Sequence, residues 1–487
     1  MKYSYSKTKY ETRYGVGSLY VGLENFKNDG SKASNIGKVN LGSTATGAKV
    51  GPRDIFGTVN YFERDMHGLT YNDVDNKFKV QATYIDNKVD GFAQPQSSWT
   101  KENGIDYNFA GKGDYTDHPS KIYNVDMEKA WENIGKHTIV AGLSYKKEEM
   151  NQTKYSLDKW RNSNNKGDIT NIDKGAVENF AFYLQDEYKV NDPLSLYVGA
   201  RVDYYKKGGG TFINYSDDNP VNTSPSESYV EVSPKIALDY KADEKTNYYI
   251  SYSHAFNPPE MYKLYRRSLN STTGNLIIAN PALEPETSDM FEIGMKKELS
   301  PKTRMGLTFY HIKTQNKISA DAIKIGEFTE WNENTQKDEY AGDIKNYQNV
   351  GEETRHGIEL ELNHEFSDKY SAYLNYAWQQ GDIAVSDPVD NTDIPTHLLH
   401  AGVEYNCDKW NALLECQYIS ERNVAEANDW EGMGSREAVF LVNTAFNYEI
   451  QKDMILQFGI NNLFDKIYYC DEPIDGRTYY VGLRYSF

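Results

Sequence analysis

The stretch "GRTYYVGLRYSF", residues 476–487, ends the chain on a strict alternation of side chains. One face of this stretch carries Tyr479, Val481, Leu483, Tyr485 and Phe487. The other carries Thr478, Tyr480, Gly482, Arg484 and Ser486. Because successive side chains of a β-strand point to opposite faces, the stretch predicts a strand with one apolar and one polar wall. That polar wall can face solvent outside a soluble sheet, or the water-filled inside of a membrane barrel.

The composition narrows these classes. The chain has 487 residues, with 53 Lys and Arg against 71 Asp and Glu, a formal charge of −18. This acidic balance argues against a nucleic-acid partner, because such proteins are usually basic. No stretch approaches 18 apolar residues, so no membrane-spanning helix is predicted. Aromatic residues make up 14%, with 40 Tyr, which fits both a Tyr-rich soluble β-domain and the aromatic girdles of a membrane barrel.

The connections between alternating segments decide between these two. Short turns are expected at 133–136, 190–193, 242–246, 299–302, 366–369, 407–409 and 450–453. Long polar links are expected between them, at about 150–177, 207–227, 257–285, 317–353, 380–395, 421–436 and 465–475. A bacterial outer-membrane barrel places all its long loops on one side, whereas a sandwich has no reason to do so. We therefore predict an all-β fold, an antiparallel transmembrane β-barrel with about 19 strands over residues 1–487.

Charges on the apolar faces agree with this prediction. A charge facing lipid costs about 2–4 kcal/mol at the bilayer midplane and little near the interfaces. The one carboxylate found on an apolar face, Asp186, lies close to the 190–193 turn. Only a closed barrel satisfies all backbone polar groups in lipid without helices.

The first residues, "MKYSYSKTKYETRYGVG", already alternate as a strand and contain no apolar core of a signal peptide. Counting back with strict alternation makes residues 1–11 a strand that runs toward the short-turn side. A short turn is then expected near Thr12–Tyr14. Before residue 120 the sequence contains the fewest turn and alternation signals from which strands can be counted.

Four motifs in order go beyond pattern: "YSHAFNPPEMYKLY" (252–265), "NPALEPETSDMFEIGMK" (280–296), "NVGEETRHGIELEL" (349–362) and "NNLFDKIYY" (461–469). Together with the terminal strand they resemble the TonB-dependent outer-membrane receptors. The two loop boxes of that family match Phe256, Pro258 and Pro259, and then Asn280, Pro281, Pro285 and Glu286. Each proline removes a backbone donor and ends strand pairing, so a role in shaping the loop is the simplest interpretation.

The resemblance implies a barrel of the 22-strand type, with short periplasmic turns and long extracellular loops, in the outer membrane of a diderm bacterium. It implies TonB-energised uptake of a scarce nutrient, first a ferric siderophore, with haem or cobalamin as alternatives. The implied partners are the TonB complex, outer-membrane lipid including lipopolysaccharide, and the barrel-assembly machinery, which reads Tyr485 and Phe487. The family's signal peptide, plug domain and first strands have no counterpart in this sequence, so we expect them outside it.

Ligand-contact candidates lie between the two loop boxes: Tyr262, Tyr265, Arg266 and Arg267. Arginine suits anionic chelates through its planar, forked donors, and aromatic rings suit aryl ligands. Trp331 and Tyr347, in the longest loop, form a second set. A solvated loop remains an open alternative for all six residues. Residues 257–279 contain no His, which makes a haem ligand less favoured.

Two other classes of function remain open: an outer-membrane enzyme barrel, and a secreted β-rich binding protein. No Ser/His/Asp set with a defensible spacing is found, so no catalytic residue is predicted. Cys407, Cys416 and Cys470 are expected to be three free thiols, because a hairpin turning at 407–409 separates the first two. We predict no metal site and no cofactor.

Overall fold

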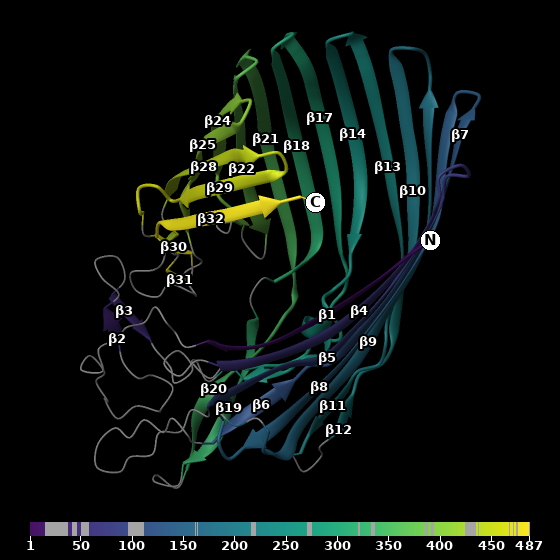
Figure 1. Cartoon of the computed structure of the whole chain (residues 1–487). Helices are drawn as coiled ribbons and strands as arrows, with labels where there is room; N and C mark the ends of the chain where they lie inside the picture. Colours follow the sequence, from purple (N-terminus) through teal and green to yellow (C-terminus); the bar gives the residue numbers. More distant parts are fainter. Residues whose placement is uncertain are drawn as a thin grey trace.

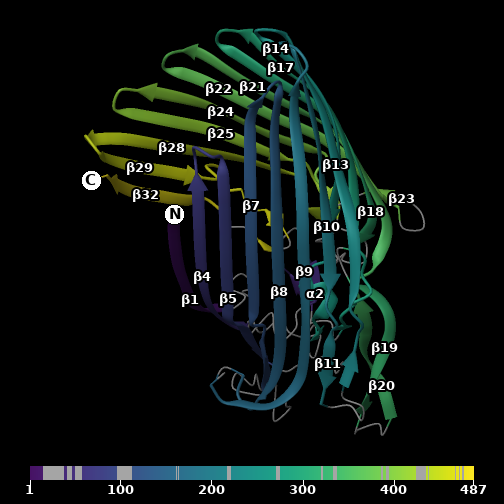
Figure 2. The same ribbon diagram turned by 90° about the vertical axis from the view of Figure 1, so that its right-hand side faces the viewer.

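The structure of the chain is a computed structural model. It describes residues 1–14, 38–40, 46–49, 58–95, 112–160, 162, 164–215, 221–269, 275–319, 322–332, 337–384, 388–390, 394–423, 435–436, 438–466, 468–470, 472–473 and 476–486. Strands dominate, and one large antiparallel sheet curls through most of the molecule (Figures 1 and 2). In the part of the chain described, no helix is long and apolar enough to cross a membrane.

The large sheet contains 22 strand segments. Four of them are short, namely β6 (Gly113–Asp117), β11 (Thr211–Asn214), β12 (Val221–Thr223) and β23 (Pro388–Asp390). The other 18 are β1 (Lys2–Tyr14), β4 (Thr58–Asp73), β5 (Phe78–Pro95), β7 (Ser120–Ile134), β8 (His137–Leu157), β9 (Lys166–Lys189), β10 (Leu194–Lys207), β13 (Glu227–Asp243), β14 (Thr246–Asn257), β17 (Glu286–Ser300), β18 (Thr303–Ile318), β21 (Asn349–Ser367), β22 (Tyr370–Ala384), β24 (His397–Cys407), β25 (Trp410–Ile419), β28 (Val439–Gln451), β29 (Met454–Asn461) and β32 (Thr478–Tyr485).

The remaining elements lie in the long connections. They are β2 (Lys38–Asn40), β3 (Thr46–Lys49), α2 (Met261–Tyr265), β15 (Ser268–Leu269), β16 (Leu276–Ile277), β19 (Ile323–Asn332), β20 (Lys337–Asn346), β26 (Arg422–Asn423), β27 (Ser435–Arg436), β30 (Tyr469–Cys470) and β31 (Glu472–Pro473).

Short and long connections alternate along the chain, as the sequence predicts. All seven expected short turns join neighbouring antiparallel strands, from β7–β8 to β28–β29. An eighth short turn, between β4 and β5 at residues 74–77, was not predicted. Because the short turns lie at one end of the sheet, all the long connections lie at the other end, which we name the loop end.

The expected turn near Thr12–Tyr14 is wrong. β1 continues without a turn to Tyr14 and pairs with β4 throughout, from Lys2 opposite Thr70 to Tyr14 opposite Thr58. The sheet has 18 long strands, whereas the sequence predicts about 19. Because neighbouring strands run in opposite directions, counting one extra strand reverses the direction predicted for the first strand. β1 therefore runs toward the loop end.

The outward face of the sheet is apolar across its middle. On β9 the side chains of Phe180, Phe182 and Leu184 are 50%, 46% and 47% exposed, and a continuous apolar surface of this kind indicates lipid rather than water. Asp186 on the same face accepts a hydrogen bond at 2.8 Å from His137 Nδ1, beside the short turn. The predicted position of this carboxylate, close to the 190–193 turn, is confirmed.

The inward face repeats one packing unit, a Tyr ring laid over a Gly on the neighbouring strand. A Cβ added at Gly142 would come within 2.3 Å of the Tyr183 ring, so the ring occupies the space that a side chain would need. Tyr183 then donates a hydrogen bond to Glu128 at 2.8 Å. The same pairing recurs at Tyr249 with Gly294, Tyr310 with Gly357, and Tyr373 with Gly402.

Two long connections join each other at the loop end. β16, from the 258–285 connection, pairs in parallel with β20 of the 319–348 connection, with Leu276 opposite Ile344 and Ile277 opposite Lys345. β15 and β19 complete this small sheet on its two sides. The prediction that the 257–285 and 317–353 loops lie on the same side of the barrel is confirmed.

The two outermost strands each have one partner among the described residues. β1 pairs with β4, and β32 pairs with β29. The terminal-strand prediction holds: Tyr479, Val481, Leu483 and Tyr485 are all more than half exposed. Phe487 lies outside the described residues. Cys407 and Cys416 are free thiols as expected, and the side chain of Cys470 also lies outside the described part.

Candidate functional site: a cavity at the loop end

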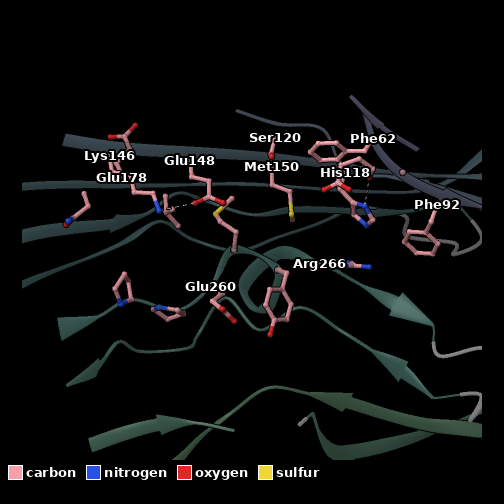
Figure 3. A pocket seen from close by; sticks show the side chains of 18 of the residues that line it. Phe62, Phe92, His118, Ser120, Lys146, Glu148, Met150, Glu178, Glu260 and Arg266 are labelled. Atoms are coloured by element: carbon pink, nitrogen blue, oxygen red, sulfur yellow. Dashed lines mark hydrogen bonds and ion pairs between the residues drawn. The ribbon is translucent and has the colours of Figure 1, made fainter. Parts of the chain in front are cut away.

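A cavity of about 840 Å³ lies inside the curled sheet, between its wall and the segment that follows β14. Strands β1, β4, β5 and β7–β10 supply one side of the lining, and residues 257–266 supply the other. In Figure 3 Arg266 extends from the loop segment toward His118 and Phe92 on the wall. The cavity therefore contains both aromatic surface and charged groups.

The loop side of the cavity is shaped by Pro258 and Pro259. Pairing of β14 with β13 stops at Ser253, and the two prolines then lead into the short helix α2. Three residues of the segment, Met261, Leu264 and Tyr265, are buried. They pack in one cluster with Met150, Phe212, Leu283 and Ile318.

Tyr265 is an anchor of this cluster. Its side chain is fully buried, and its ring lies against Gly175, where a Cβ would meet the ring at 2.2 Å. Its hydroxyl donates to the carbonyl oxygen of Gly208 at 2.7 Å and lies 3.3 Å from that of Ala176. Burial raises the pKa of Tyr265 to about 12. These contacts hold α2 against β9.

Arg267 is fixed to the wall in the same way. Its Nε and Nη2 donate to Asp173 Oδ1 at 2.8 and 2.7 Å, and Nη2 also donates to the carbonyl oxygen of Ile213 at 2.8 Å. Asp173 is fully buried and accepts a further bond at 2.9 Å from Gln152. Burial raises the pKa of Asp173, whereas Arg267 acts to lower it.

Arg266, the preceding residue, faces the cavity instead. Its guanidinium carbon lies 6.0 Å from the centroid of the Phe92 ring. His118 Nδ1 donates to the Asp90 carbonyl oxygen at 2.8 Å, which fits a neutral imidazole. Burial, with the positive charge of Arg266, lowers the pKa of His118 to about 4. Burial also raises the pKa values of Asp90 and Asp117.

Tyr262 also lines the cavity and is 40% exposed. Its ring meets the ring of Tyr347 edge to face, with centroids 5.7 Å apart, and Lys263 Nζ lies 5.1 Å from the Tyr347 centroid. The fold thus brings together one residue from each of the two predicted sets. Trp331 lies on β19 opposite Asp338 in register, and its side chain is outside the described part.

Residues of the second loop box, 280–286, form hydrogen bonds that link the 258–285 connection to neighbouring segments. Asn280 Nδ2 donates to the Tyr347 carbonyl oxygen at 2.7 Å. Lys207, buried to 1% exposure, donates to the carbonyl oxygens of Pro281 and Leu283 at 2.8 and 2.7 Å. Pro285 is buried.

The ends of the connection are joined as well. Glu286 accepts bonds from the Ile318 amide at 2.7 Å and from Asn257 at 2.8 Å. Phe256 packs against Tyr205 with ring centroids 5.9 Å apart. These contacts join the two ends of the connection to each other and to the barrel wall.

Two residues of the site were not found from the sequence. His118 appears there as a lone His in "TDHPS" (116–120), and only the following Pro119, which interrupts the strand between β6 and β7, marks the place. Asp173 lies inside an ordinary alternating segment. In the described residues no group of three or more His, Cys, Asp or Glu side chains could hold a metal ion.

Comparisons with known proteins agree with this architecture. The family model for the TonB dependent receptor-like beta-barrel matches residues 3–463. The ferripyoverdine receptor of Pseudomonas aeruginosa is 23% identical over 428 residues, covering 80% of this chain and 46% of that protein. The ferric-pyoverdine BN7/BN8 receptor of Pseudomonas putida is 22% identical over 347 residues, covering 68% and 37%.

Solved structures show the same fold at low identity. The copper transporter OprC superposes with a TM-score of 0.66 at 15% identity, covering 88% of this chain and 67% of that one. The siderophore receptor PiuA from Acinetobacter baumannii gives 0.65 at 15% identity, covering 99% and 71%. The chain spans at most half the length of the curated relatives it matches. With its apolar outward face and one-sided long loops, it belongs to the TonB-dependent receptor-like β-barrel family of the outer membrane.

Proposed function

We propose that this chain forms the barrel of an outer-membrane receptor for TonB-energised uptake of a ferric siderophore. The observation that carries the proposal is the cavity at the loop end. Its volume of about 840 Å³ falls within the range of small-molecule sites, roughly 300–1,000 Å³. Arg266 and Lys146 place positive charge in the lining, beside the carboxyl groups of Asp90, Glu148, Glu178 and Glu260. Phe92 and Tyr262 add aromatic surface next to Arg266, and a forked guanidinium beside aromatic rings suits an aryl-bearing anionic chelate.

The haem alternative has less support. Residues 257–279 contain no His, and the nearest one upstream, His254, is held by Asp289 at 2.9 Å. His118 lines the cavity, where its Nδ1 donates to the Asp90 carbonyl oxygen at 2.8 Å. His397 contacts the Tyr376 hydroxyl and His400 contacts Glu415, so these two residues serve different neighbours. The names of the relatives point the same way, because several are receptors for ferric pyoverdine.

The binding test uses the intact receptor that contains these residues. Ferripyoverdine, a ferric catecholate and haem are titrated against the native protein, an Arg266→Ala variant and a Lys369→Ala control at a short turn. We expect one of the two ferric chelates to bind, and its affinity to fall in Arg266→Ala alone. Tight binding of haem, with neither chelate bound, contradicts the proposal.

We further propose that strands outside those described here bridge β1 and β32 in the assembled receptor, with the signal peptide and plug preceding them. The support is physical: each edge has one partner among the described strands, and an unsatisfied backbone group in lipid costs several kcal/mol. TonB would act through the preceding part, and the barrel-assembly machinery would recognise the terminal strand that carries Tyr485 and Phe487.

Cysteine cross-linking distinguishes bridged edges from directly paired ones. In a background with Cys407, Cys416 and Cys470 replaced by Ser, cysteines at Ser4, Ser6 or Thr8 are combined singly with one at Gly482. No disulfide should form on oxidation, whereas the register partners Thr444 and Ile460, replaced by Cys in the same background, should cross-link. A β1–β32 disulfide in outer-membrane protein would show that the edges pair directly.

A further inference from the structure

The ring of His118 is fixed at the cavity wall by two neighbours. Its Nδ1 lies 2.8 Å from the carbonyl oxygen of Asp90, and the Phe92 ring stacks on it with centroids 5.6 Å apart. Figure 3 shows His118 and Phe92 on the wall and Arg266 on the loop segment that faces them. The second ring nitrogen, Nε2, is buried and meets no hydrogen-bond partner among the described residues.

Strand pairing places Gln152 opposite His118. Asp117 lies opposite Thr153 where β6 pairs with β8, and the two backbones are still hydrogen-bonded just beyond this pair. The next position on each strand therefore brings His118 and Gln152 together. The Gln152 side chain is close enough to act on the pKa of His118, which it raises.

The orientation of the Gln152 amide is fixed by its other bonds. Its Nε2 donates to Asp173 Oδ2 at 2.9 Å and to the carbonyl oxygen of Arg267 at 2.8 Å. A carboxylate and a carbonyl oxygen accept but do not donate, so the amide nitrogen must face them and Oε1 is left on the side of His118. This Oε1 is buried and also meets no hydrogen-bond partner within the described part of the chain.

One proton on the ring would satisfy both atoms. A neutral imidazole carries a single N–H, so it can donate to the Asp90 carbonyl oxygen or to Gln152 Oε1, but not to both. An imidazolium carries two and donates to both. Because buried polar groups are rarely left unpaired, the hydrogen-bonding geometry favours the imidazolium.

Burial and Arg266 oppose this proton. Burial is the larger cause and the positive charge of Arg266 the second, and together they lower the pKa of His118 to about 4. The Arg266 guanidinium lies 6.0 Å from the centroid of the Phe92 ring that stacks on His118. Its charge is the opposing factor that a ligand can change, because an anion bound to the guanidinium offsets it.

Other charged groups lie near this contact. The carboxyl groups of Asp90 and Asp117 have pKa values that burial raises, and a bound anion would raise them further. Asp173 is paired with Arg267. The remaining charged groups are Arg64 on β4, Lys166 on β9 and the ion pair of Lys154 with Asp114. Any pH dependence of the site must therefore be assigned with a variant of His118 itself.

We propose that His118 takes up one proton from solvent when an anionic chelate binds beside Arg266, and that the imidazolium then donates to Gln152 Oε1. The new bond joins His118 to a side chain that is already bonded to the Arg267 carbonyl oxygen, so the wall and the loop segment are linked more firmly in the ligand-bound state. The affinity for the chelate rises as the pH falls from neutral toward about 4, where the unliganded ring is itself protonated. The inference rests on the proposed function and adds proton uptake to it.

The first test needs no chelate. Histidine carbons are labelled in the intact receptor, and the NMR signal of His118 is identified by its loss in His118→Asn. The pKa of His118 should rise by about one unit in Arg266→Gln, which removes the charge, and should stay near the native value in Arg266→Lys, which keeps it. In the Arg266→Gln background, Gln152→Met removes the acceptor and should lower that pKa again. The same His118 pKa in the native protein and in Arg266→Gln overturns the proposal.

The second test measures the protons taken up on binding. Ferripyoverdine and a ferric catecholate are titrated by calorimetry in two buffers of different ionisation enthalpy, with the native protein, His118→Asn and His364→Asn. His364 bonds to Thr303 near a short turn and is the matched control. The native protein and the control should take up more protons per chelate than His118→Asn. Between about pH 7 and about pH 5, the affinity ratio of native protein to His118→Asn should rise about threefold or more.

Equal proton uptake by the three proteins overturns the proposal. If neither chelate binds, the proposed function fails, and the NMR titration still decides whether His118 responds to the charge of Arg266. The two failures are therefore distinguishable.

Discussion

The two faces of the segment from Met261 to Arg267 contrast with each other. On one face Tyr262 and Arg266 line the cavity. On the other, Leu264, Tyr265 and Arg267 are packed or bonded to the barrel wall. The two arginines differ most: Arg267 is fixed by a buried carboxylate, whereas Arg266 lies beside a half-buried aromatic ring at the cavity surface.

This contrast shows how a loop can direct side chains into a cavity without losing its position. The wall-facing residues hold the segment in place through contacts within the protein. Substitution on the two faces should therefore affect different measurements. Wall-facing changes should alter the stability of the loop, and cavity-facing changes should alter affinity.

The largest effect is expected for Arg267→Ala. This change leaves Asp173 buried without its cation, and breaking a buried pair in this way costs about 3–5 kcal/mol. The free energy of local opening, from hydrogen exchange of amides in β11 and α2, should fall by that amount. Lys313→Ala, which breaks an exposed pair, is the control and should cost less than about 1 kcal/mol. Equal small effects in both variants would remove Arg267 from the anchoring face.

Leu264→Ala should give the next largest effect. Leu264 is fully buried in the cluster with Phe212 and Leu283, and Leu→Ala changes at such sites cost about 2–5 kcal/mol. The exchange of α2 amides should accelerate accordingly, whereas the affinity for a ferric chelate measured under saturating, folded conditions should change little. An affinity loss without faster exchange would contradict the division between the two faces.

Arg266→Ala should leave exchange unchanged and weaken chelate binding. A hydrogen bond to a charged group is worth roughly 1.5–3 kcal/mol, which corresponds to an affinity loss of about 10- to 150-fold. Isothermal titration of the intact receptor measures this directly. An unchanged affinity would place the ligand away from this part of the cavity.

A further effect concerns pH and His118. Its pKa is lowered to about 4 in the folded protein, against roughly 6.5 when unfolded, so its contribution to stability is complete above pH 6.5 and is lost as the pH falls toward 4. Asp90 and Asp117 have raised pKa values and act in the opposite direction. The difference in thermal midpoint between the native protein and His118→Asn isolates the histidine. That difference should shift in favour of His118→Asn as the pH decreases from 6.5 to 4, and a constant difference would contradict the lowered pKa.

Sequence patterns predicted the fold well because the barrel is built from local alternation. Side chains at 180, 182 and 184 point outward whatever lies far away in the chain, and Pro258 and Pro259 end pairing through their own chemistry. The arrangement of the site depends instead on contacts between residues that are far apart in the sequence. Arg267 and Asp173 are 94 residues apart, so no local pattern could separate Arg267 from Arg266, and both were assigned to the ligand. The sequence places Tyr262 and Tyr347 in two separate candidate sets and does not predict that their rings meet.

The parallel pairing of β16 with β20 has an evolutionary consequence. These two strands belong to different long connections, yet their backbones are joined through Leu276 opposite Ile344 and Ile277 opposite Lys345. An insertion or deletion in one connection would shift its register against the other. Long loops of such receptors are the part most free to diversify toward new ligands, because loops tolerate changes in length better than the elements they connect. Here the two connections would have to diversify together, as one inherited unit.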